Sequence, residues 1–72
     1  MWLRRSDATR EEETEAILAG ADMLDYAEAR RFGISHAEVM EALVYRDFAD
    51  YLRLRKAGNS HSAALVNAEW RN

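Results

Sequence analysis

Apolar side chains recur at helical spacing, every three or four positions, along most of this chain. Three segments show the pattern: 10–32, 36–57 and 61–71. No proline interrupts them, and a threonine or serine that can cap a helix stands before each one. The pattern therefore predicts an all-α protein of three helices joined by short turns.

The middle segment is apolar around more of its circumference than a surface helix needs. Its apolar residues are Val39, Met40, Ala42, Leu43, Val44, Tyr45, Phe48, Ala49, Tyr51, Leu52 and Leu54. We expect this helix to lie centrally, with neighbours on two sides. A chain of 72 residues without cysteine has no disulfide to support its small core, so we expect a second chain to complete the cover.

The segment DYAEARRFGISHA at 25–37 returns as DYLRLRKAGNSHS at 50–62. Six of the thirteen positions are identical, at an offset of 25 residues. The repeat predicts one helix end, one turn and the next helix start, used twice.

Each repeated turn has the residues of a helix stop followed by a helix start. Gly33 and Gly58 follow basic residues and suit the left-handed position after a helix. Ser35 and Glu38 have the spacing of a capping box, and Ser60 keeps the cap in the second copy. A further box, Thr9 with Glu12, precedes the first helix.

The run DYAEARRFGISHAEVMEAL resembles a short helical repeat, D-Y-x(3)-R-[RK]-x-G-x-S-H, of uncharacterised small bacterial and phage proteins. The resemblance covers most of 22–72. It implies stacked helix–turn units about 25 residues long and no particular chemistry.

A second resemblance, over about twenty residues, is to the helix-turn-helix of DNA-binding proteins. Ala29, Phe32, Gly33, Ile34 and Val39 stand where that motif places its small, apolar and turn residues. The second helix of the motif, however, begins HAEVME and would place two glutamates against phosphate, where bases are usually read by Arg, Asn or Gln. The net charge of −3 supplies no general attraction to nucleic acid.

The pattern indicates no catalytic or metal site. There is no glycine-rich phosphate loop. Ser35 and Ser60 adjoin histidines, but neighbouring side chains at a helix start point apart, and capping occupies each serine. His36 and His61 would begin opposite ends of a helix roughly 33 Å long, so they could not share an ion. We expect no enzyme activity, no metal, no cofactor and no small-molecule substrate.

The trios Asp22–Tyr26–Arg30 and Asp47–Tyr51–Arg55 have four-residue spacing, which would align each trio along one helix face. The pattern fits a packed tyrosine ring with solvated neighbours. It also fits a protein interface, because tyrosine and arginine anchor interfaces. The candidate interface residues are Tyr26, Arg30, Tyr45, Phe48, Tyr51, Leu52, Arg55 and Trp70.

We therefore expect a single small helical domain over 1–72, in which residues 1–8 form a flexible arm. The sequence shows neither a secretory signal nor a membrane span, so we expect a soluble cytoplasmic protein. The predicted function is non-enzymatic protein–protein interaction or self-association, as a homo-oligomer such as a dimer or with another protein. The alternatives are a small helix-turn-helix-like DNA-binding regulator and a protein inhibitor of a larger enzyme or complex.

Overall fold

The computed structural model describes residues 9–71, which form five α-helices and no β-strand. The helices are α1 (Arg10–Leu18), α2 (Met23–Phe32), α3 (His36–Tyr45), α4 (Phe48–Lys56) and α5 (His61–Asn67). The all-α prediction is confirmed, and the prediction of three helices is wrong. The arm predicted at 1–8 lies outside the described residues.

The predicted helix 10–32 is two helices, because the chain leaves helical geometry after Ala19. Gly20 has a φ of +110°, a left-handed value that stops α1. Asp22 then caps α2: its carboxylate accepts hydrogen bonds from the N–H groups of Leu24, at 2.9 Å, and Asp25, at 3.2 Å. Gly20 thus marks a helix end, and the apolar periodicity that runs through it hides the break.

The predicted helix 36–57 is also two helices, because Arg46 is extended, with φ −129° and ψ 163°. Arg46 forms an isolated antiparallel bridge with Trp70. Beside it, the N–H of Asp47 donates to the carbonyl of Glu69 at 2.9 Å. Neither glycine nor proline stands at this break. A contact with residues more than twenty positions away therefore interrupts the helix.

The same contact shortens the last helix, which was predicted to reach residue 71. Ala68 is extended, with φ −72° and ψ 151°, and ends α5 at Asn67. The N–H of Arg71 donates to the carbonyl of Tyr45 at 3.2 Å, and its guanidinium donates to the carbonyl of Leu43 at 2.5 Å. Residues 68–71 therefore lie extended along the end of α3.

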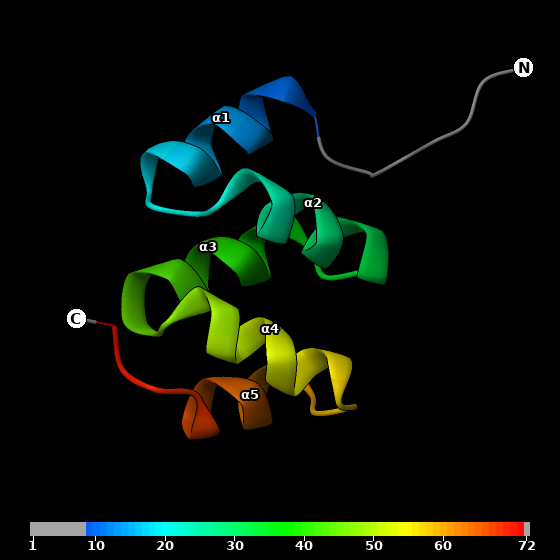
Figure 1. Ribbon diagram of the computed structural model, residues 1–72, viewed down its shortest axis with the longest axis vertical. Coiled ribbons are helices and arrows are strands. Elements are labelled where there is room, and N and C mark those ends of the chain that lie inside the picture. The colour runs from blue at the N-terminus through cyan, green and yellow to red at the C-terminus, as the bar shows by residue number, and fades with distance from the viewer. Residues whose placement is uncertain (1–8, 72) are drawn as a thin grey trace, which may run out of the picture.

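The helices form two layers. In one layer α1 contacts α3 and α3 contacts α5, and in the other α2 contacts α4. α3 contacts all four of the other helices, which is the central position expected for the apolar middle segment. Figure 1 shows the α1–α2 and α3–α4 connections and the C-terminal segment at one edge, and the two glycine turns at the other. Helix–turn units stacked in this way form a short repeat array.

Both repeated turns have the geometry that the sequence predicts. Gly33 and Gly58 have φ values of +105° and +106°. Ser35 and Glu38 form the predicted capping box, with both side-chain-to-backbone hydrogen bonds at 3.2 Å. Ser60 caps α5 by accepting from the N–H of residue 63, also at 3.2 Å.

The core contains many small side chains and three large aromatic ones. Its members in the described range are Ala16, Ala21, Tyr26, Ala29, Ile34, Val39, Ala42, Leu43, Phe48, Tyr51, Leu52, Ala64 and Ala68. The alanines allow the helix backbones to approach closely. Tyr26 and Tyr51 are the largest fully buried side chains among these residues, so the helices pack around two tyrosine rings.

We expect Gly33→Ala to lower the free energy of unfolding by about 1–2 kcal/mol, the cost of a left-handed conformation for an L-residue. No atom lies within 4 Å of the added Cβ, so backbone strain alone sets the loss. Gly33→Asn should lose less, since asparagine tolerates this conformation better. Urea denaturation of the two variants measures the difference, and an alanine variant as stable as the wild type would contradict it.

Candidate functional site

The buried hydroxyl of Tyr26 is the centre of a hydrogen-bonded cluster that joins three helices. Arg30, one turn further along α2, donates to this hydroxyl and to Glu12 of α1, both at 2.8 Å. The hydroxyl also lies 2.8 Å from Nδ1 of His36 on α3. Nε2 of that histidine lies 2.6 Å from Glu15 of α1. We name these five residues the first clamp.

The repeat builds a second clamp around Tyr51, which joins α3, α4 and α5. Arg55 lies 2.8 Å from the Tyr51 hydroxyl and 3.5 Å from Glu38 of α3. The hydroxyl lies 2.7 Å from Nδ1 of His61, and Nε2 of His61 lies 2.9 Å from Glu41 of α3. Both histidine rings meet their tyrosine edge-on, with centroids 5.9 and 5.7 Å apart.

The chemistry of these groups fixes which one donates and which one accepts in each hydrogen bond of a clamp. A guanidinium only donates, so the tyrosine oxygen accepts from arginine and its own proton is free to go to Nδ1. A carboxylate only accepts, so Nε2 of the histidine carries a proton. If the imidazole is neutral and protonated at Nε2, each bond in the series from arginine to tyrosine, tyrosine to histidine and histidine to glutamate has one donor and one acceptor. Each clamp can therefore bury its tyrosine without an unpaired polar group.

α3 belongs to both clamps, since it supplies His36 to the first and Glu38 and Glu41 to the second. α1 supplies only glutamates, and α5 supplies only a histidine. At the α5 positions that correspond to the two α3 glutamates, the chain has Ala63 and Val66. Residues 9–71 thus contain two overlapping clamps, and the glutamates needed for another one are missing from α5.

The glutamates that bind the histidines, Glu15 and Glu41, are not among the residues predicted for a site. A signal for them exists, because Thr9-x-x-Glu12-x-x-Glu15 returns as Ser35-x-x-Glu38-x-x-Glu41. This match has an offset of 26 residues, whereas the turns repeat at 25. A search at a single offset therefore misses that α1 corresponds to α3.

Most of the predicted interface residues are buried in the core or hydrogen-bonded within the chain itself. Tyr26 and Tyr51 have no exposed surface, and Phe48 and Leu52 are 7% and 4% exposed. Arg30 and Arg55 are held in the clamps. Of the eight residues proposed, only Tyr45 and Trp70 expose more than half of their surface, at 53% and 67%.

The predicted side-chain trios are not single stripes along helices. Asp22 and Asp47 stand at the N-cap positions of α2 and α4, one residue before each helix begins. The carboxylate of Asp22 is bound to its own helix start. Only the tyrosine and arginine of each trio act together.

The prediction that His36 and His61 begin opposite ends of one long helix is wrong, because residues 36–57 form two helices, α3 and α4. Each histidine is instead bound to its own tyrosine and glutamate. Within residues 9–71, no three His, Cys, Asp or Glu side chains are placed to hold a metal ion together.

A crevice of about 660 Å³ lies between the α1–α2 connection, the α3–α4 connection and the C-terminal segment. Arg46 lies on the Trp70 ring, with its guanidinium carbon 3.6 Å from the centroid, and donates to the carbonyl of Ala68 at 3.3 Å. Burial raises the pKa of Asp25 in this crevice, and the nearby carboxylate of Asp22 raises it further. The titratable side chains that line the crevice are the carboxylates of Asp22, Asp25, Asp47 and Glu69 and the guanidinium groups of Arg46 and Arg71.

No known protein family, curated protein or solved structure matches this chain. In the described part of the chain, every helix is too short or too polar to cross a membrane. The geometry of these residues is therefore the basis for assigning a function.

We expect Tyr51→Phe to lower the free energy of unfolding by about 1–3 kcal/mol, because Nδ1 of His61 and Arg55 lose a buried hydrogen-bond partner. Tyr45→Phe is the matched control: its ring is half exposed, so the change should stay within about 0.5 kcal/mol. Chemical denaturation compares the two variants. Equal losses would show that the hydroxyl of Tyr51 contributes nothing specific.

Acid should weaken the fold through the clamp glutamates. The hydrogen bond from Arg30, followed by that from the N–H of Thr9, lowers the pKa of Glu12 from its ordinary 4.5. Burial alone would raise the pKa of Glu38, but the N–H of Ser35 and the charge of Arg55 outweigh it, so this pKa is lowered as well.

A carboxyl with a lowered pKa stabilises the folded chain above its unfolded pKa and loses that effect as pH falls through the folded pKa. We therefore expect the free energy of unfolding to decline below about pH 4.5. In Glu12→Gln and Glu38→Gln the decline should be shallower. Denaturation curves measured at a series of pH values test this, and identical slopes in variants and wild type would refute it.

Proposed function

We propose that this chain is a non-enzymatic protein-interaction module that associates with a second copy of itself through its C-terminal edge. The supporting observation is that three large apolar side chains at or near this edge, those of Val44, Tyr45 and Trp70, are exposed. We name these three residues the edge patch. Their exposed fractions are 59%, 53% and 67%. Tyrosine and tryptophan are enriched among residues that anchor protein interfaces.

The edge patch is held in place before any partner arrives. The backbone of Tyr45 accepts from the N–H of Arg71, and Arg46 is bridged to Trp70. The Arg46 guanidinium also covers one side of the Trp70 ring. An aromatic anchor that is already positioned loses less conformational entropy on binding, which favours a contact here.

The repeat adds to this support, since Tyr45 and Trp70 are 25 residues apart and occupy equivalent positions. The other repeated aromatic pair, Tyr26 and Tyr51, is buried in the clamps. The edge patch is thus a place where the repeat presents large aromatic surface outward.

The DNA-binding alternative finds no support on α3, which stands in the place of a recognition helix. Its outward side exposes Ala37, Glu41, Val44 and Tyr45 and no basic residue. Glu41 would face the phosphates and repel them, whereas Lys and Arg supply the charge neutralisation on which DNA affinity depends.

We expect the solution mass to rise from 8.3 kDa toward that of two chains as the concentration increases a hundredfold. Trp70→Ala and Tyr45→Ala should each weaken this association about tenfold or more, as the loss of an aromatic anchor does. Light scattering after size exclusion measures both effects.

Phe32→Ala is the matched control, because Phe32 is 52% exposed at the end of α2, beside a glycine turn at the opposite edge. It should leave the association unchanged. A wild-type mass that stays at one chain over the whole range would overturn the proposal, as would an equal effect of Phe32→Ala.

A further inference from the structure

The two layers of the array differ in charge. Helices α1, α3 and α5 carry six glutamates and one arginine, whereas α2 and α4 carry three acidic and five basic residues. The clamp glutamates Glu12 and Glu38 are half-buried, whereas Glu11, Glu15 and Glu41 are exposed. The layer of α1 and α3 therefore presents an acidic surface to solvent.

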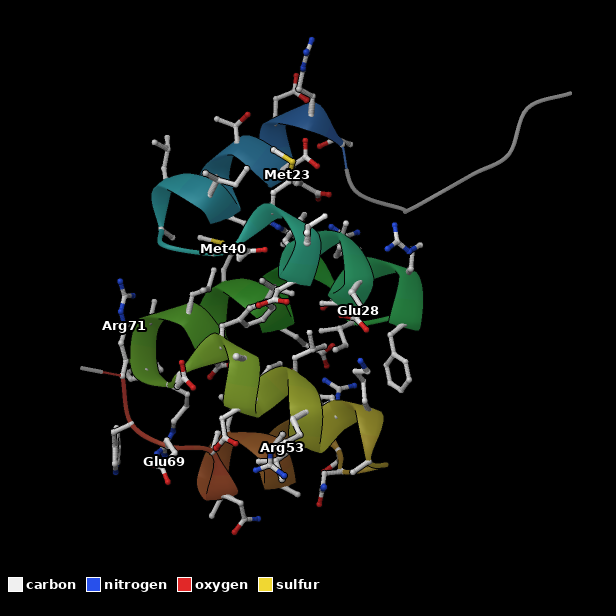
Figure 2. The ribbon with its side chains drawn as sticks, in the orientation of Figure 1. Met23, Glu28, Met40, Arg53, Glu69 and Arg71 are labelled. Atoms are coloured by element: carbon white, nitrogen blue, oxygen red, sulfur yellow. The ribbon has the colours of Figure 1, made fainter. Side chains whose placement is uncertain are left out.

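The same surface carries apolar side chains. Leu18, at the end of α1, is 83% exposed. Met40 of α3 is only partly buried against the core, and Figure 2 shows it between α1 and α3. A groove of about 680 Å³ runs along α1, lined by Arg10, Glu11, Glu12, Thr14, Glu15 and Leu18. Carboxylates thus lie beside one exposed apolar side chain, Leu18, and one partly exposed apolar side chain, Met40.

The clamps position two of these carboxylates for a partner. Glu15 and Glu41 each use one oxygen, Oε1, to bind a histidine. Their side chains remain 62% and 53% exposed, so the remaining oxygen can accept from an external donor. Glu15 and Glu41 occupy equivalent positions in neighbouring helices of the array. Their spacing is therefore set by the packing of α1 against α3.

We propose that the outer face of α1 and α3 binds a basic amphipathic helix from a partner protein. We name this surface, made of Glu11, Glu15, Leu18, Met40 and Glu41, the acidic face. Lysines or arginines of the partner would pair with the three glutamates, and its leucine-type side chains would cover Leu18 and Met40. Two neighbouring helices leave a groove between their side-chain ridges into which a third helix fits.

The negative charge of the acidic face favours a basic helix over a second copy of this chain or a nucleic acid. A second copy presenting the same face would bring like charges together, which is unfavourable. Nucleic acid would be repelled for the same reason. The acidic face shares no residue with the edge patch, so this proposal stands independently of self-association.

The test uses two fluorescein-labelled helical peptides of eighteen residues with the same leucine face. One peptide has lysine on its polar face, and the other has glutamate. Fluorescence anisotropy with the full chain should show binding of the lysine peptide alone. Raising the salt from 50 to 300 mM should weaken that binding, because screening reduces attraction between exposed charges.

Variants of the chain locate the contact. Glu11→Gln and Leu18→Ala lie outside the clamps and should each weaken binding of the lysine peptide about fivefold, through lost charge attraction and lost apolar burial. Glu28→Gln removes an equivalent charge from α2, in the other layer, and should leave the affinity unchanged. Circular dichroism of each variant verifies that the helices are intact.

Three results would overturn the proposal. They are equal binding of the two peptides, no binding of either, and an effect of Glu28→Gln as large as that of Glu11→Gln. A loss of self-association in Glu11→Gln would also overturn it, because a second copy would then occupy the acidic face. If neither peptide binds but the solution mass still rises with concentration, the acidic-face proposal fails and the proposed self-association stands.

Discussion

Two buried tyrosine hydroxyls impose the main constraint on this fold. A phenol removed from water must keep its hydrogen bonds, because an unpaired buried polar group costs about 1–3 kcal/mol. Burial raises the pKa of both Tyr26 and Tyr51, which keeps each hydroxyl protonated and able to donate. Each hydroxyl accepts from an arginine of its own helix and donates to a histidine of the next helix, and both partners bind glutamates of a third helix. Satisfying one hydroxyl therefore sets the rotation and register of three helices at once.

The clamps also explain how so small a core can hold five helices over residues 9–71. Alanines bring the backbones close, and each tyrosine ring then fills the space where three helices meet. Because α3 contributes to both clamps, a disturbance of one alters the helix on which the other depends. The two repeat units are therefore coupled through α3, as neighbouring units of a repeat array are.

The clamps determine which surfaces remain for partners. The tyrosines and arginines of the clamps bind one another inside the fold, although their residue types alone would suggest a protein–protein interface. Two surfaces remain exposed. The edge patch lies where residues 68–71 meet the end of α3, and the acidic face contains the clamp carboxylates that reach solvent. The two surfaces differ in chemistry, one aromatic and the other charged, so they suit different partners.

Features that depend on residues close together in the chain can be predicted from the amino-acid sequence alone. The all-helical class, the left-handed glycines 33 and 58, the capping serines and the Ser35–Glu38 box follow from local backbone chemistry. The break at Arg46, the end of α5 at Asn67 and the burial of Tyr26 and Tyr51 follow instead from tertiary packing. Each of these depends on groups distant in sequence, such as the bridge from Arg46 to Trp70 and the bond from Tyr51 to His61. Helical periodicity shows on which side of a helix a tyrosine lies. Only the packing of the helices shows whether that side is buried within the chain or exposed to solvent.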